Sequence, residues 1–192
     1  MNKILKSVLS MATVSLLMVS FNATAQDKKV IKTEASTVTW KGYKVTGAHE
    51  GTIDLKSGSL DITEDKLTGG EFVINMGSLI STDLEGESKG KLEGHLKSDD
   101  FFGVEKFPTA KLVFKTVKST GKNSYEVVGD ITIKGKTEAV TLDVSVYGSK
   151  ANAALKIDRT KFDVRYGSAS FFDDLKDKAI YDDFDLIVDL EF

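Results

Sequence analysis

The stretch FDLIVDLEF, residues 184–192, shows the pattern that decides the fold. Its apolar side chains take every second position, at Phe184, Leu186, Val188, Leu190 and Phe192. Acidic residues fill most of the positions between them. Because successive side chains of a strand point to opposite faces, this spacing predicts a strand with one dry face and one wet face. Such strands are typical of antiparallel sheets, since parallel sheets are usually covered on both faces.

The same period of two recurs through the chain, in about eight or nine short runs. The apolar members of the other runs are Val38 and Trp40; Leu60 and Ile62; Phe72, Ile74 and Met76; Leu112 and Phe114; Val127, Ile131 and Ile133; Leu142, Val144 and Val146; Leu155 and Ile157. Turns are predicted at the Gly, Asn and Ser clusters of residues 56–59, 120–123, 134–136 and 148–150. No repeat or compositional boundary divides the chain, which predicts one all-β domain.

An antiparallel set of this size must close into a barrel or stack as a sandwich, and alternation alone does not choose between them. A barrel of about eight strands has room for one small ligand when side chains do not fill its interior.

Two segments interrupt the alternation. In residues 84–102, Leu92, His95 and Leu96 lie at helical spacing and predict a short helix, although three glycines weaken it by about 1 kcal/mol each. The stretch LKSDDFFGVEKFP, residues 96–108, then places three phenylalanines outside any predicted strand. They are expected at the mouth or flank of a barrel, or as ordinary core anchors under a long connection. The second segment, residues 168–183, is rich in acids.

The N-terminus has the features of a secretory signal peptide. Lys3 and Lys6 precede the uncharged, mostly apolar residues 7–21, and Ala23-Thr24-Ala25 resembles a cleavage site. We therefore predict a signal peptide at residues 1–25, a folded domain at residues 26–192, and a periplasmic protein without stable membrane insertion. The apolar run is shorter than the roughly 20 residues of a membrane span. The chain contains no cysteine, so it has no disulfide and no lipidated cysteine.

Charge and motifs exclude several classes of function. The chain has a formal net charge of −3 with both signs interspersed, so no nucleic-acid partner is expected. Residues 86–90 fit G-x-S-x-G but lack the buried strand and the later Asp–His order of a nucleophile elbow. His49 and His95 lack metal-ligand spacing. We predict a non-enzyme without metal or cofactor. The only arginines, Arg159 and Arg165, are expected to form structural ion pairs rather than ligand contacts.

Three stretches resemble a known family: GAHEG at residues 47–51, HLKSDDFF running to KFP at residues 95–108, and GDITIKG at residues 129–135. They resemble the YceI-like, polyisoprenoid-binding periplasmic proteins, and the likeness extends from about Glu34 to Phe192. The resemblance implies a single antiparallel lipocalin-like barrel with one or two short helices in its crossovers. It further implies non-catalytic binding, carriage or sequestration of an isoprenoid, a quinone or another long-chain lipid.

The predicted ligand-binding residues come from the apolar strand faces and the Phe-rich segment: Trp40, Phe72, Ile74, Met76, Phe101, Phe102, Phe107, Leu112, Phe114, Val144, Val146 and Leu155. For each, a close-packed dry core is the alternative. The alternative function is an envelope stress or interaction protein that uses the same barrel without a lipid and exposes an apolar patch. A homodimer through sheet edges or long loops is compatible with the sequence, which does not specify one.

Overall fold

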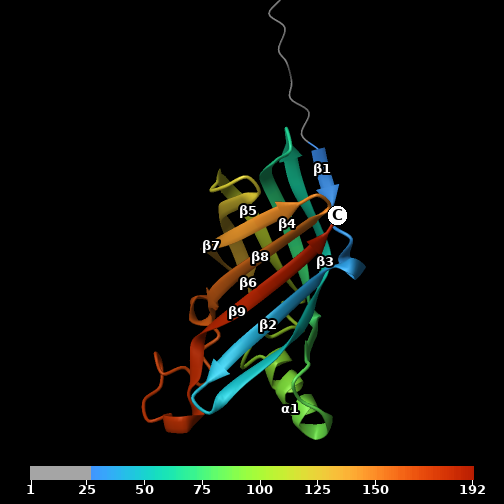
Figure 1. Cartoon of the computed structure of the whole chain (residues 1–192). Coiled ribbons are helices and arrows are strands. Elements are labelled where there is room, and N and C mark those ends of the chain that lie inside the picture. Colours follow the sequence, from blue (N-terminus) through green and yellow to red (C-terminus); the bar gives the residue numbers. More distant parts are fainter. Residues whose placement is uncertain (1–26) are drawn as a thin grey trace, which may run out of the picture.

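A computed structural model describes residues 27–192 of the chain (Figure 1). The predicted signal peptide, residues 1–25, lies outside the described residues. The elements are β1 (Asp27–Val30), η1 (Thr33–Ala35), β2 (Thr37–Lys44), β3 (Gly47–Thr63), β4 (Lys66–Ser81), α1 (Gly86–Lys97), β5 (Thr109–Ser119), β6 (Ser124–Ile133), β7 (Lys136–Tyr147), β8 (Lys150–Asp158), η2 (Arg159–Phe162), η3 (Lys176–Lys178) and β9 (Ile180–Glu191).

Eight of the strands close into an antiparallel barrel. From β2 to β9 each strand pairs with the next along the chain. Strand β9 then pairs with β2, from Thr37 opposite Asp189 to Lys44 opposite Ile180, and closes the cylinder. This confirms the predicted all-β barrel of about eight strands and resolves the choice between barrel and sandwich.

Strand β1 was not predicted, because Gln26–Lys29 reads as a polar lead-in. Asp27–Val30 instead pairs with residues 59–62 of β3. The reason is that β2 pairs with β3 only as far as Ile53, which leaves the rest of that strand edge open to another partner. Three of the four residues of β1 are exposed, so the strand does not need an apolar side chain at every second position. The alternation that marks the other strands is therefore absent from its sequence.

The turn predicted at residues 56–59 is wrong, because these residues lie within the long strand β3. The register against β4 shifts between Leu55 and Ser57, as at a β-bulge. A Cβ atom on Gly58 would come within 2.7 Å of the Phe72 ring. The glycine is therefore needed to make room for this ring, and it does not reverse the direction of the chain. The other three predicted turns are confirmed, and each connects two neighbouring strands.

The predicted helix is confirmed as α1, which lies at the lower end of the barrel in Figure 1. Leu96 is buried and Leu92 packs against the core. The Glu93 carboxylate accepts a hydrogen bond of 2.9 Å from the backbone N–H of Ser81, which ties the helix to the end of β4. These tertiary contacts offset the cost of the glycines. None of the helices in residues 27–192 has the length and apolarity needed to cross a bilayer.

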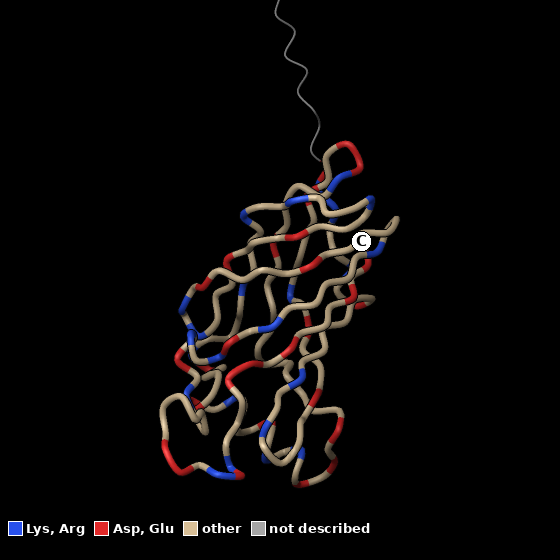
Figure 2. Tube along the Cα trace, turned by 60° about the vertical axis from the view of Figure 1, so that its left-hand side comes forward, with Lys and Arg blue, Asp and Glu red and all other residues tan. Residues whose placement is uncertain are grey.

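The core fills the inside of the barrel. In β6 every second residue is buried, including Tyr125, Val127, Ile131 and Ile133. Charged residues of both signs are interspersed over the strands and loops (Figure 2). The predicted alternation is thus confirmed as a dry interior and a wet exterior.

Candidate ligand tunnel

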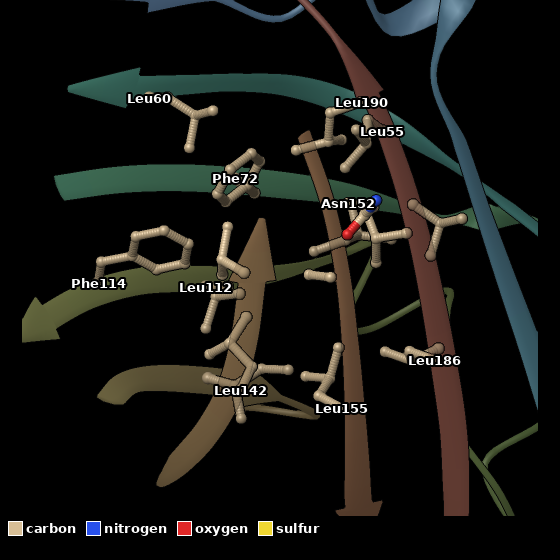
Figure 3. Close-up of a pocket in the computed structure, with 16 residues that line it drawn as sticks. Leu55, Leu60, Phe72, Leu112, Phe114, Leu142, Asn152, Leu155, Leu186 and Leu190 are labelled. Carbon is tan, nitrogen blue, oxygen red and sulfur yellow. The ribbon is translucent and has the colours of Figure 1, made fainter. Parts of the chain in front are cut away.

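The barrel interior contains three adjoining chambers. The inner chamber has a volume of about 60 Å³ and is lined by residues such as Phe72, Leu112, Phe114, Leu142 and Leu155. Figure 3 shows these side chains converging from several strands on one space. An apolar cavity that exceeds the roughly 10–15 Å³ needed for one water tends to stay dry and accept apolar ligands.

The middle chamber, of about 110 Å³, follows toward α1. Its wall includes Trp40, Met76, Phe101, Phe102 and Phe184. Four residues line both the inner and the middle chamber, namely Val38, Ile74, Ile131 and Leu186. The two spaces therefore adjoin at these aliphatic residues.

The outer chamber, of about 90 Å³, continues the path to the end of the barrel beside α1. It shares Trp40, Gly42, Tyr43, Phe101 and Ile180 with the middle chamber. The residues that it adds are Lys44, His49, Leu92, His95 and Leu96. The three chambers together form what we call the tunnel: an apolar path whose outer end is bordered also by Lys44, His49 and His95.

The structure places ten of the twelve predicted ligand-binding residues on the tunnel wall. The inner chamber receives Phe72, Ile74, Leu112, Phe114, Val144 and Leu155, and the middle chamber receives Trp40, Met76, Phe101 and Phe102 as well as Ile74. Whether these side chains bind a ligand stays a prediction.

Phe107 and Val146 line none of the three chambers. The Phe107 ring packs over the turn between β6 and β7, where a Cβ on Gly135 would lie 3.0 Å from it. Val146 lies near the end of β7, where its N–H donates to the Asn123 carbonyl at 2.9 Å. Both are partly buried and act as packing residues.

Sequence reasoning missed several wall residues, among them Val38, Leu55, Ile131, Leu186, Val188 and Leu190. Their signal was present, because all but Leu55 belong to the apolar faces read from the alternation. A closed barrel turns every such face toward one interior, so the full set of faces predicts the wall better than a selection of large side chains.

Glycines shape the inner chamber by letting two aromatic rings approach the backbone. A Cβ on Gly70 would lie 3.0 Å from the Phe114 ring, and Gly58 stands in the same relation to Phe72. The two rings meet at 5.6 Å between centroids and 51° between planes. The rings therefore lie against the strand on one side and border the cavity on the other.

One buried cation, Arg159, adjoins the middle chamber. Its side chain is 2% exposed and donates to the carbonyl oxygens of Tyr181, Val164 and Ile180 at 3.0, 2.7 and 3.0 Å. Asp182 lies 3.6 Å away as an ion-pair partner. Burial lowers the pKa of the Arg159 guanidinium, and the two nearby carboxylates of Asp182 and Asp158 oppose that effect. Arg159 thus forms the predicted ion pair, and the absence of a ligand contact stays a prediction, since the residue borders the middle chamber.

The outer chamber carries an imidazole with a fixed orientation. Nδ1 of His49 lies 2.8 Å from the Asp83 carboxylate, which also accepts from the Ser81 hydroxyl at 2.7 Å. Burial would raise the pKa of Asp83, but the hydrogen bonds from Ser81 and His49 outweigh it and hold the pKa below its usual value. Since a carboxylate only accepts, neutral His49 carries its proton on Nδ1 and leaves Nε2 as an acceptor.

A second polar group at this end is Asp185. It accepts hydrogen bonds from Lys156 at 2.7 Å and from the Tyr43 hydroxyl at 2.6 Å. The Lys156 ammonium and then the Tyr43 hydroxyl lower the pKa of the Asp185 carboxyl. This cluster fixes the hydroxyl of Tyr43, a residue that borders both the middle and the outer chamber.

The Asp185 cluster predicts a pH-dependent contribution to stability. Because the folded-state pKa of Asp185 is depressed, its stabilisation is present above the unfolded value of about 3.9 and is lost as pH falls through the folded value. The side chain is 33% exposed, so we expect Asp185→Asn to lower the free energy of unfolding by only about 0.5 kcal/mol at pH 7. Urea unfolding at pH 7 and near pH 3 should show this difference only at the higher pH. Asp189→Asn, an exposed acid on the same strand, is the control. An equal loss at both pH values would contradict the assignment.

A closed eight-stranded antiparallel barrel around an apolar interior defines a lipocalin-like barrel protein. A family model described as the YceI-like domain matches residues 30–192. The chain belongs to the YceI-like family.

The relatives agree with this assignment. A UPF0312 protein of Pseudomonas putida is 40% identical over 75 residues, which cover 37% of this chain and 39% of the relative. A UPF0312 protein of Shewanella denitrificans is 30% identical over 98 residues, which cover 51% and 49%. The chain thus matches less than half the length of these curated relatives.

Solved structures show the same fold. BcnA of Burkholderia cenocepacia superposes with a TM-score of 0.66 at 22% identity, covering 83% of this chain and 98% of BcnA. A polyisoprenoid binding domain from Saccharophagus degradans gives 0.56 at 14% identity, covering 86% and 97%. The YCEI protein of Campylobacter jejuni gives 0.52 at 15% identity and covers 98% of both chains. At these identities the likeness concerns the fold alone.

Proposed function

We propose that this protein binds a long isoprenoid-type lipid in its tunnel, without catalysis, and carries or sequesters it in the periplasm. The observation that carries the proposal is the tunnel itself: chambers that adjoin through shared aliphatic residues and whose inner two are walled almost wholly by carbon. A Saccharophagus degradans relative in fold is described as a polyisoprenoid binding domain, which supports the choice of ligand class.

The physical argument is the hydrophobic effect. A chain segment that buries on the order of 300 Å² of apolar surface gains about 7.5 kcal/mol at about 25 cal/mol per Å², before the cost of association. Such a ligand needs no hydrogen bond along its length. An isoprenoid, the tail of a quinone and other long-chain lipids all meet this requirement.

Binding without catalysis is supported by the state of the polar groups near the inner two chambers. Arg159 is engaged with three backbone carbonyls and Asp182. Ser88, the serine of the G-x-S-x-G match, lies exposed on the first turn of α1 instead of on a strand-to-helix elbow. The periplasmic location rests on the predicted signal peptide.

The direct test is mass spectrometry of the organic extract from protein purified under native conditions without detergent. We expect a stoichiometric isoprenoid or quinone mass, or uptake of one after incubation with membrane lipids. An extract that stays empty after that incubation would contradict the proposal. It would favour the alternative of an interaction protein, for which the exposed Phe171 and Phe172 near the end of the chain offer an apolar surface.

A tunnel-filling substitution tests where the ligand lies. Ala153 lines the inner chamber, whereas its neighbour Ala154 is exposed on the outside of the same strand. We expect Ala153→Phe to lower the affinity for a long isoprenoid at least tenfold while shorter chains still bind, because the added ring occupies the inner chamber. Overpacking costs about 1–3 kcal/mol, so thermal unfolding must confirm a folded variant. Ala154→Phe adds the same ring outside the tunnel and should leave affinity unchanged. Equal affinities of both variants for the long chain would place the ligand elsewhere.

A further inference from the structure

The order of residues along the strands shows where the tunnel stops. On β4, Met76 lines the middle chamber, Ile74 lines the middle and inner chambers, and Phe72 lines the inner chamber. The next large apolar residue in the same direction, Leu67, lines none of the three chambers. Strand β6 repeats this order with Ile133, Ile131 and Val127.

The end of the barrel away from α1 is filled by side chains. Leu67 of β4, Val127 of β6 and Ala151 of β8 are 4%, 0% and 3% exposed and belong to the core. Val117 and Phe192 pack against that core from β5 and from the end of β9. In the part of the chain that the structure describes, these side chains close the barrel beyond the inner chamber.

A groove on the outer surface borders the same region but is separated from the tunnel. It shares Asn152 and Leu190 with the inner chamber. Strands β8 and β9 stay paired there, with Asn152 opposite Asp189 and Ala151 opposite Leu190. The hydrogen-bonded sheet therefore lies between the groove and the chamber.

Two aromatic rings, which we call the floor pair, border the closed end. Phe72 and Phe114 are the last residues of β4 and β5 to line the inner chamber, and neither lines the middle one. Figure 3 shows Phe114 at the edge of the group of lining side chains, with Phe72 beside it. Gly58 and Gly70 lie directly behind these rings, so the backbone blocks any retreat of the pair.

We propose that the floor pair is the stop that sets how long an isoprenoid chain the tunnel can enclose. This inference rests on the proposed function. The chain would enter from the α1 end, and any excess length would stay outside at that end. The floor pair is thus a specificity-determining feature for chain length.

The length of the tunnel follows from β9. Ile180 lines the outer chamber, and Leu190, ten residues further on, lines the inner one. At about 3.3 Å per residue and a strand tilt of about 40°, the tunnel is about 25 Å long. We expect the length limit at the isoprenoid chain that spans this distance when extended.

The experiment measures the affinity for a series of isoprenoid alcohols of increasing chain length. Trp40 is the only tryptophan of the chain and borders the middle and outer chambers, so its fluorescence reports occupancy. Phe114→Ala removes one ring of the floor pair, and Phe114→Leu is a milder variant in case the first does not fold. Phe184→Ala is the matched control, because it removes the same ring from the wall of the middle chamber. Thermal unfolding shows which variants are folded.

For the unsubstituted protein we expect affinity to rise about tenfold with each added isoprenoid unit up to the length limit, and less than about twofold per unit beyond it. Phe114→Ala should move the limit to a chain one unit longer, because the removed ring is comparable in volume to one isoprenoid unit. Phe184→Ala should leave the limit where it is, even if it weakens binding of every chain.

Two kinds of result would contradict these expectations, and they separate the two proposals. Saturable binding with no length limit, or with the same limit in the unsubstituted protein and in a folded Phe114 variant, would overturn this inference alone. An equal shift of the limit in Phe184→Ala would do the same, since the floor pair would then not be what sets it. No saturable binding of any chain to the unsubstituted protein would overturn the proposed function as well.

Discussion

Replacing Arg159 with methionine is expected to lower the free energy of unfolding by about 4 kcal/mol. The substitution keeps much of the apolar volume of the side chain but removes the donors to three backbone carbonyls. It also leaves Asp182 without its cation. Those acceptors lie at the junction of η2, the following loop and the start of β9, where water cannot easily replace the guanidinium. Chemical denaturation at neutral pH measures the effect.

Arg165 provides the matched control, because it is the only other arginine. Its side chain is exposed, pairs with Asp163 at 2.7 Å and lies over the Phe171 ring at 4.7 Å. Exposed pairs contribute little, so Arg165→Met should change stability by no more than about 0.5 kcal/mol. A loss below about 1 kcal/mol in Arg159→Met would mean that water satisfies the three carbonyls, and the structural role assigned to Arg159 would fail.

Gly51→Ala is expected to cost about 3 kcal/mol, although it adds a single methyl group. A Cβ atom at this position would lie 1.8 Å from the carbonyl oxygen of Ile80 and 2.8 Å from the Trp40 ring. Neither can yield cheaply, because the Ile80 oxygen accepts the Trp40 indole N–H at 3.1 Å. Strands β3 and β4 would have to separate beside the middle and outer chambers.

Gly42→Ala is the control for this substitution. Gly42 lies on the neighbouring strand β2, and a Cβ there would meet nothing within 4 Å. We expect it to be neutral or slightly stabilising, because alanine loses less backbone entropy on folding. Thermal unfolding of the two variants side by side gives the comparison. Similar melting temperatures would show that the close contact at Gly51 relaxes without cost.

The sequence predicts the architecture well where side chains alternate. Burial at every second residue of β6 follows directly from its pattern, because a strand with one wet face has no other way to shield its apolar side chains. The helix was also predictable, from Leu92 and Leu96. The Leu96–Pro108 segment shows the limit: Phe101 and Phe102 reach the middle chamber, but Phe107 packs over Gly135. Composition cannot distinguish these three rings, since only the path of the connection decides where each one points.

Other features depend on contacts between distant segments. Gly58 lies in a stretch whose composition is typical of a turn. In the structure it pairs with Phe72 of β4, whose ring needs the space that the glycine leaves, and it belongs to the bent strand β3. The unpaired Nε2 of His95 is likewise invisible in the sequence, because a histidine on a short helix usually finds a partner. Strand β1 forms only because β2 leaves part of β3 uncovered. In each case the deciding neighbour is far away along the chain.

The pairing of β2 with β9 also determines when the barrel can close during folding. The wall of the tunnel is complete only when the last strand, Ile180–Glu191, lies beside the first strand of the barrel. Without β9, a sheet of β2 to β8 would have two open edges and an exposed apolar face, and long-range closures of this kind are slow. The cavity that would receive a lipid is therefore the final product of synthesis and folding. If the proposed function holds, we expect a lipid to enter only after β9 has paired with β2.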